Sequence, residues 1–225
     1  MYAGDSDDVF VFGQPGNYEW TESWLVKTQP YIKTFQIFVS PADREPRLDY
    51  GPGTSSGPPY SYPGNGIGCW NGNAGGWESH GVIVPHLDWW TDGAVGPDGL
   101  TRGTYSVSAT SVGLPAETIM TAERHKIRPY ADRNISGAWD LNDVVLMGWN
   151  GDLPGQTKDT VFGAPTPTSF GSITAPYANN ATFSFVDGHA AALNPIKTVN
   201  TAAGNNIVCD GTNDFLKMWD ARRTQ

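Results

Sequence analysis

The clearest pattern of hydrophobic and polar positions lies near the end of the sequence, in the segment FSFVDGHAAAL at residues 183–193. Apolar and polar residues alternate up to Asp187-Gly188, and a run of small residues follows. Aspartate followed by glycine suits a two-residue type I′ turn, in which both central residues need a positive φ. The segment therefore predicts a β-hairpin. Its register places four side chains on one face, which we expect to join the core: Phe183, Phe185, Ala190 and Ala192.

Shorter patterns predict the other elements. Apolar or alternating runs predict strands at residues 35–39, 104–112, 117–123 and 143–149. The spacing of Trp20, Trp24 and Lys27 predicts a short surface helix, which Pro30 ends at the preceding residue. A terminal helical turn is predicted within residues 213–223, with three apolar side chains on one side: Phe215, Met218 and Trp219.

Residues 44–103 interrupt these patterns. Glycine, proline, asparagine and aspartate cluster there, as in GPGTSSGPPYSYPGNGIG, and such clusters favour turns over strand ladders. We therefore expect a loop-rich insertion in a single domain that spans residues 1–225. Loops of this length usually carry function or bind a neighbour.

Composition supports a globular fold and excludes some partners. A chain of 225 residues can bury a substantial core, and its 9 Trp, 9 Tyr and 9 Phe residues supply apolar area beside 27 Gly and 17 Pro. The predicted fold class is α+β, rich in β-structure, with an antiparallel sheet and long irregular loops. The formal net charge of -9 argues against a nucleic-acid partner. No run approaches the roughly 20 apolar residues of a membrane helix.

Motifs of nucleophilic or metal-dependent catalysis do not occur in the sequence. The sequence has no Gly-x-Ser-x-Gly elbow and no glycine-rich phosphate loop. Its four histidines fall in no metal-binding spacing: His80, His86, His125 and His189. Glu117 and Glu123 form a carboxylate pair of the kind that glycoside hydrolysis uses, but a chain with 23 acidic residues contains such pairs by chance. The sequence therefore predicts a protein that is not an enzyme and has no cofactor, apart from calcium.

Calcium is the one ion that the sequence suggests. Three acidic clusters offer hard oxygen ligands: Asp5, Asp7 and Asp8; Asp140, Asn142 and Asp143; and Asp210, Asn213 and Asp214. The first cluster lacks the glycine and distal glutamate of an EF-hand and also reads as solvated charge at a helix end, and the other two also read as turns.

Tryptophans and cysteines leave alternatives open. Trp70, Trp77, Trp89 and Trp90 could fill a core, form a subunit interface or stack on sugars. The two cysteines, Cys69 and Cys209, are either a long-range disulfide or two unrelated buried thiols.

Five segments in order resemble one known family. They are MYAGDSDDVF, W-x-x-x-W-L with PYIK, FQIFVSPAD, LPAETIMTAE and ANNATFSFVDGHAAAL. This order is similar to that of bacterial prepilin-type proteins with the processing-associated H-X9-DG signature, relatives of type IV pilins and of the major pseudopilin of type II secretion. Most of residues 44–103 lies outside the resemblance.

The chain departs from the family pattern at two positions. Asp187-Gly188 match the Asp-Gly of the signature, but Tyr177 stands where the family has its histidine. Ser40-Pro41 stand where relatives often have Cys-Pro. The second departure removes a cysteine, and the resemblance then implies Cys69–Cys209 as the intrachain disulfide that remains.

The resemblance also implies a fold and a function. Family members carry an apolar N-terminal helix, and this chain starts at the junction that follows it. We therefore expect a pilin-like head whose helix was cleaved or is a separate short chain. Its expected function is that of a non-catalytic, self-associating subunit of an extracellular filament at the bacterial cell surface. The only membrane contact would be through that helix.

Two other functions remain alternatives. An extracellular carbohydrate-binding or adhesive module would need exposed tryptophans, and a secreted hydrolase would need carboxylates or a nucleophile that converge in one cleft.

Overall fold

The computed structural model describes residues 4, 7–11, 13, 23–44, 46, 58–71, 76–83, 107–125, 145–146, 153–156, 170–203 and 214–224. For the strand residues 69–71, 76–79 and 145 it describes the backbone alone.

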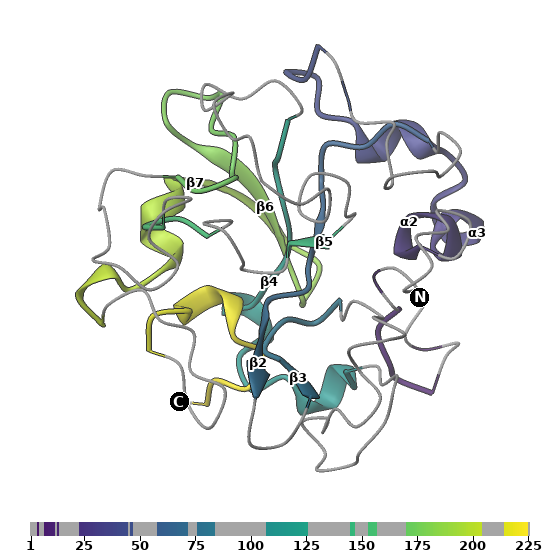
Figure 1. Cartoon of the computed structure of the whole chain (residues 1–225). Helices are drawn as coiled ribbons and strands as arrows, with labels where there is room; N and C mark the ends of the chain where they lie inside the picture. Colours follow the sequence, from purple (N-terminus) through teal and green to yellow (C-terminus); the bar gives the residue numbers. More distant parts are fainter. Residues whose placement is uncertain are drawn as a thin grey trace.

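A five-stranded sheet organises this part of the chain, in the order β5-β1-β4-β6-β7 (Figure 1). Its strands are β1 (Gly64–Asn65), β4 (Ile119–Ala122), β5 (Val145–Leu146), β6 (Ala181–Phe185) and β7 (Ala190–Leu193). Four of them, β1, β4, β6 and β7, form an antiparallel ladder, and β5 pairs with β1 in parallel. With a few short helices around it, this sheet gives the small β-rich or α+β fold that the sequence predicts. The strand predictions for residues 117–123 and 143–149 each contain a strand of this sheet.

The closing hairpin forms, but its register differs from the prediction by one residue. Phe183 lies opposite Ala191, and the amide of Phe185 donates to the carbonyl of His189 across a three-residue loop. Gly188 alone has a positive φ in this loop (93°), and the amide of Gly188 donates to the carbonyl of Phe185. This is a type I turn followed by a residue with positive φ, in place of the predicted type I′ turn.

The one-residue shift exchanges the faces of β7, because successive side chains point to opposite faces. Ala191 and Leu193 are half-buried and pack against the core with Phe183 and Phe185, whereas Ala190 and Ala192, which were predicted to share that face, are exposed.

Residues 44–103 contain more regular structure than their composition predicts. Besides β1, they form a separate two-stranded antiparallel sheet from β2 (Gly68–Asn71) and β3 (Gly76–Ser79). Turn-forming residues thus separate short strands here, rather than replacing them.

Helices are short throughout the described residues. The helical prediction is confirmed for α2 (Trp24–Lys27), but Trp24 and Leu25 in it are buried and not on the surface, and Trp20 lies outside the described residues. Pro30 does not end the helical segment. It lies in the first turn of a second helix, α3 (Gln29–Ile32), where its missing amide costs nothing. Six 3-10 helices follow: η2 (Phe35–Phe38), η3 (Ala109–Ser111), η4 (Pro115–Glu117), η5 (Pro195–Thr198), η6 (Thr201–Ala203) and η7 (Lys217–Trp219).

The strand prediction for residues 35–39 is wrong, and the one for residues 104–112 is wrong in its described part, residues 107–112. Residues 35–38 form η2, where the side chain of Thr34 accepts a hydrogen bond from the amide of Gln36 and fixes the first turn. Within residues 107–112, an isolated bridge at Ser108 is followed by η3. Both segments are apolar runs too short for periodicity to separate a strand from a helical turn.

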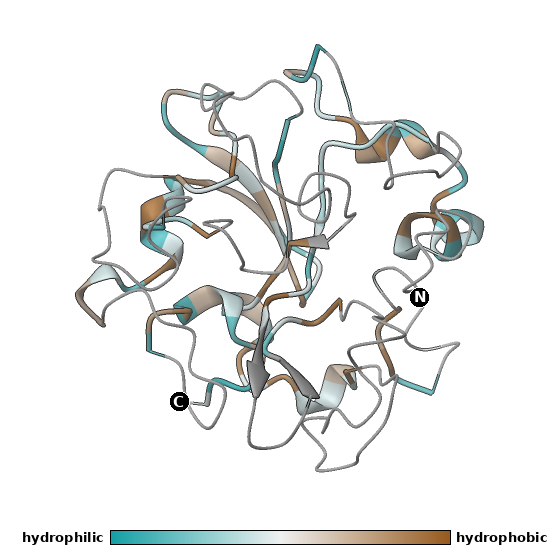
Figure 2. Cartoon of the chain, in the orientation of Figure 1, coloured by the Kyte–Doolittle hydropathy of each residue, from teal (hydrophilic) through white to brown (hydrophobic). Residues whose placement is uncertain are grey.

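The buried hydrophobic residues form two clusters. One joins α2 and η2, with Trp24 packed edge-on against Phe38 at a centroid distance of 5.1 Å. The other joins β4 and β6 to the C-terminal turns, where Phe183 meets Trp219 edge-on at 6.2 Å. As predicted, Phe215, Met218 and Trp219 pack together, in the second cluster. Figure 2 shows hydrophobic colouring on η2 and on parts of the central strands.

In the described part of the chain, no helix has the length and apolar character that crossing a membrane requires.

Candidate functional site

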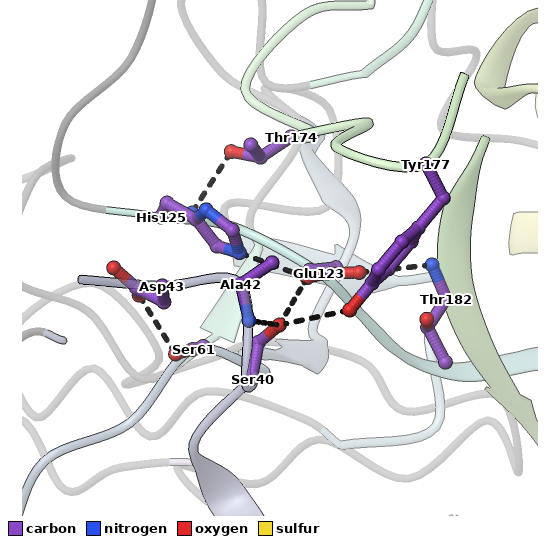
Figure 3. A network of polar contacts seen from close by, with 9 residues as sticks. All are labelled: Ser40, Ala42, Asp43, Ser61, Glu123, His125, Thr174, Tyr177 and Thr182. Atoms are coloured by element: carbon purple, nitrogen blue, oxygen red, sulfur yellow. Dashed lines mark hydrogen bonds and ion pairs between the residues drawn. The ribbon is translucent and has the colours of Figure 1, made fainter. Parts of the chain in front are cut away.

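A group of polar residues around one buried carboxylate lies where β4 ends, and Figure 3 shows it from close by. We call it the Glu123 network: Ser40, Glu123, His125, Tyr177 and Thr182. Its residues come from three separate parts of the sequence, which the fold brings together.

Strand pairing places the centre of the network. Glu123 directly follows β4, which pairs with β6 through Ala122 and Phe183. The ladder continues one residue further, because the amide of Glu123 donates to the carbonyl of Thr182 at 3.1 Å. The amide of Thr182 in turn donates to Oε2 of Glu123 at 3.1 Å. The carboxylate is thereby fixed against the β6 backbone.

Glu123 accepts two further hydrogen bonds, both at Oε1. Ser40 Oγ donates at 2.5 Å and His125 Nε2 donates at 2.8 Å. The glutamate side chain has no exposed surface, and burial alone raises the pKa of such a carboxyl group. The hydrogen bonds from His125, Ser40 and the Thr182 amide outweigh burial, so the pKa of Glu123 lies below its ordinary value. The network therefore holds an ionised carboxylate inside the protein.

Ser40 connects the carboxylate to the loop that follows η2. Its single hydroxyl proton goes to Glu123, so its oxygen accepts from its other neighbours. The amide of Ala42 donates to Ser40 Oγ at 3.2 Å, and the hydroxyl of Tyr177 lies 3.4 Å away. Ser40 is thus both a donor to the charge and an acceptor that orders the turn at residues 40–43.

Tyr177 is placed by a tight turn. The amide and carbonyl of Tyr177 exchange hydrogen bonds with Asn180, and the two residues between them, Ala178 and Asn179, have φ of 50° and 65°. Two central residues with positive φ are the mark of a type I′ turn. The turn type predicted at Asp187-Gly188 therefore occurs at Ala178-Asn179, without a glycine. Tyr177 remains 41% exposed, so the network reaches the surface through its ring.

Further polar residues surround the network. Burial raises the pKa of Tyr62 above its ordinary value, although a hydrogen bond with Ser40 lowers it. Ser61 donates to Asp43 Oδ2 at 2.7 Å, and the amide of the fully buried Arg124 donates to the carbonyl of Ser61 at 2.7 Å. These contacts tie the turn at residues 40–43 to the chain that leads into β1.

The order of groups determines what chemistry this geometry can support. In a catalytic triad the imidazole lies between the serine and the carboxylate. Here the carboxylate of Glu123 lies between Ser40 and His125, so no base contacts the serine hydroxyl except the carboxylate that holds it. The geometry is that of a hydrogen-bonded clamp that joins three segments.

Each histidine in the described residues is paired with a carboxylate. Besides His125, the buried His80 lies 3.3 Å from Asp220, and the exposed His189 lies 2.6 Å from Asp187. Hydrogen bonds lower the pKa of Asp187, while for Asp220 they outweigh the burial that raises its pKa. The fourth histidine, His86, lies outside the described residues.

The two glutamates that suggested a carboxylate pair have separate partners. Glu117 lies before β4 and is exposed, and it pairs with Arg223 at 2.7 Å. Glu123 lies after β4 and belongs to the buried network. The strand between them separates the two carboxylates.

The acidic clusters are described only in part. Asp8 Oδ2 accepts hydrogen bonds from Ser108 Oγ and the Thr110 amide, at 3.3 and 3.2 Å, and so ties the N-terminal segment to η3. Asp214 lines a pocket of about 420 Å³ together with Lys217 and Arg223. Among the residues with described side chains, no three His, Cys, Asp or Glu residues form a group that could hold a metal ion. Several residues of these clusters lie outside the described residues: Asp5, Asp140, Asn142, Asp143, Asp210 and Asn213.

The tryptophan and cysteine predictions also lie largely outside the description. Trp70 and Trp77 face each other across the β2-β3 ladder, where Cys69 is opposite Glu78, but only their backbones are described. Trp89, Trp90 and Cys209 lie outside the described residues.

Sequence reasoning named Glu123, His125 and Tyr177 separately and missed that they meet. One signal was available: Glu123 and His125 are two residues apart at a strand end, so their side chains project to the same side. The contact of Ser40 with Glu123, 83 residues apart, has no local signal.

Comparisons of the chain with protein-family models, with curated proteins and with solved structures found no match.

Proposed function

We propose that this chain is the globular head of a structural, non-catalytic subunit of an extracellular filament of the type IV pilus or pseudopilus kind. In this role the head would be displayed on the filament surface. The filament core would be built from apolar helices, which belong either to the same polypeptide or to a short partner chain. The acidic, loop-rich composition suits a head that stays soluble and packs against its neighbours through loops.

The observation that carries the proposal is which segments of the sequence supply the residues of the Glu123 network. Ser40 ends the apolar run in FQIFVSPAD, Glu123 ends LPAETIMTAE, and Tyr177 stands at the position of the signature histidine. These are three of the places by which the sequence resembles prepilin-type proteins. In the fold, Ser40 Oγ donates to the Glu123 carboxylate, and the Tyr177 hydroxyl lies 3.4 Å from Ser40 Oγ. Segments that resemble a family by accident have no reason to converge, whereas segments that specify a common fold do.

The departures from the family pattern support the same interpretation. Ser40 and Tyr177 are the two departures from the pattern, and their side-chain oxygens lie 3.4 Å apart. Substitutions at two neighbouring positions of one site are expected when each compensates for the other. The cysteine and histidine of relatives would then correspond to a hydroxyl pair in this chain.

Cryo-electron microscopy of filaments sheared from cells that make the protein tests the proposal. The expected result is a helical repeat of this head around a core of apolar helices. The Glu123→Ala variant, which we expect to destabilise the head, should reduce the yield of filaments, whereas the exposed Asp187→Asn variant should leave it unchanged. A monodisperse monomer from the native source, with no filament and no associated helix, would overturn the proposal.

A further inference from the structure

Strand β7 forms one edge of the five-stranded sheet (Figure 1). It pairs with β6 on one side only, and the order of strands in the described part of the chain places no other strand beyond it. An edge strand presents a row of backbone amides and carbonyls that can pair with another chain.

The alternation of hydrogen-bonded and non-hydrogen-bonded pairs in the hairpin identifies which backbone groups of β7 point away from β6. Phe185 and His189 form a hydrogen-bonded pair, and hydrogen-bonded and non-hydrogen-bonded pairs alternate along an antiparallel ladder. The pairs Ser184 with Ala190 and Thr182 with Ala192 are therefore non-hydrogen-bonded. It follows that the amides and carbonyls of Ala190 and Ala192 point away from β6.

These outward groups are accessible. Ala190 and Ala192 are both exposed, and their backbone groups have no hydrogen-bond partner in the described part of the chain. The strand has the sequence AAAL and contains no charge, proline or bulge, which are the usual features that keep an edge strand from pairing. Alanine side chains also leave room for a second backbone to approach.

We propose that β7 pairs in antiparallel fashion with β7 of a second copy of this chain, about a two-fold axis at Ala191. In this register Ala190 of each copy lies opposite Ala192 of the other, so every outward amide meets an outward carbonyl. A strand whose two outward-facing residues are both alanine is complementary to itself in this orientation. A second copy therefore supplies a hydrogen-bond partner for each outward amide and carbonyl of β7.

Charge at the two ends of β7 favours the same occupant. The exposed Asp187 precedes the strand and the exposed Lys197 follows it. Antiparallel pairing brings the beginning of one strand to the end of the other, so each Asp187 approaches the segment that carries Lys197 of the second copy. A parallel arrangement would instead bring like charges together, which opposes pairing.

The proposed contact is small and closed. Four residues on each side bury far less than the roughly 1,200–2,000 Å² of a standard interface, so free heads should pair weakly. A two-fold contact also cannot propagate, and it is distinct from the head-to-tail contacts that build a helical filament. It would join heads of neighbouring assemblies, where many weak contacts act together. The pairing itself does not depend on the proposed function, whereas its place between neighbouring assemblies rests on it.

Sedimentation of the 225-residue chain over a range of concentrations tests the pairing. We expect a reversible dimer at high concentration. Ala192→Pro removes one outward amide without touching a bond to β6 and should raise the dimer Kd about tenfold or more. Ala192→Ser, which keeps the amide, is the matched control, and thermal unfolding verifies that both variants are folded. A chain that stays monomeric, or a proline variant that dimerises like the wild type, would overturn the inference.

Disulfide cross-linking tests the register separately. A mixture of Ala190→Cys and Ala192→Cys chains should give a cross-linked dimer, because these positions lie opposite each other. Each variant alone should cross-link much less, and the wild-type chain controls for Cys69 and Cys209. Equal yields from the mixture and from the single variants would contradict the antiparallel register.

Discussion

Two acid–histidine pairs in this protein have the same spacing along the chain and opposite surroundings. Glu123 pairs with His125 at 2.8 Å, and Asp187 pairs with His189 at 2.6 Å. The first carboxylate is fully buried and accepts hydrogen bonds from three groups, whereas Asp187 and His189 are 37% and 44% exposed. A similar contact distance therefore says little about how much each pair contributes to stability.

The physical difference is what happens when one partner is removed. A buried ion or charge-assisted network left incomplete typically costs about 3–5 kcal/mol, because the remaining polar groups lose both partner and water. Exposed pairs are solvated in either state and contribute little. The Glu123 network should therefore contribute much more to the stability of the protein than the hairpin pair does.

The largest effect is expected from Glu123→Ala. Ser40, His125 and the Thr182 amide all lose their common acceptor, so the free energy of unfolding should fall by about 3–5 kcal/mol in urea denaturation. Glu117→Ala, which removes the exposed partner of Arg223, is the control and should change it by less than about 1 kcal/mol. If the two variants were equally stable, the contrast between buried and exposed pairs would be wrong.

The loss of stability at acid pH should depend on the same carboxylate, that of Glu123. The pKa of Glu123 is lower in the folded protein than in the unfolded chain, so the unfolded state binds the proton more readily. The resulting stabilisation is fully present above the unfolded pKa of about 4.3 and is lost as the pH falls through the lower folded value. Urea denaturation between neutral and strongly acidic pH should show a shallower decline for Glu123→Gln than for the wild type. Parallel curves would mean that Glu123 does not carry this dependence.

Ser40 should have an intermediate effect. Ser40→Ala removes one charge-assisted donor but leaves His125 and the Thr182 amide on Glu123, and the expected loss is about 1.5–3 kcal/mol. Ser40→Cys retains a weak donor and should fall between alanine and the wild type. A serine-to-alanine change without cost would show that the 2.5 Å contact contributes nothing, and that Ser40 is only a turn residue.

The sequence predicts elements that depend on neighbouring residues, but it does not predict contacts between residues far apart in the chain. The closing hairpin, strand β4 and the terminal turn all follow from apolar patterns of a few residues. The Glu123 network does not, because Ser40 and Tyr177 reach Glu123 through the tertiary fold. The strand prediction for residues 35–38 fails for a related reason, since an apolar run does not say whether Thr34 will cap a 3-10 turn.

The hairpin register shows a subtler limit. Asp-Gly suits a type I′ turn, but the core accepts the hairpin only with Ala191 and Leu193 inward, and burial of Leu193 favours the longer loop. At Ala178-Asn179 the opposite occurs, because hydrogen bonds around Tyr177 hold two residues without glycine's freedom in a type I′ turn. Tertiary contacts thus decide between turns that local propensity alone cannot separate.

Gly188→Ala should have a modest effect on the exposed hairpin. Gly188 has φ of 93°, and a methyl group added there would meet no atom within 4 Å, so the cost is conformational and not steric. We expect a loss of about 1–2 kcal/mol, measured by thermal unfolding. Gly188→Asn, which tolerates positive φ better, should cost less. Equal losses for the two variants would mean that the turn conformation does not limit stability here.

The smallest effect is expected from Asp187→Asn. The asparagine oxygen can still accept from the His189 amide, and the lost ion pair is exposed to solvent on both sides. The melting temperature should therefore match that of the wild type at neutral pH, and so should that of His189→Ala, because the side chain of His189 is exposed. A clear loss in both variants would show that the exposed ion pair itself contributes to stability, which would contradict the contrast with the buried pair.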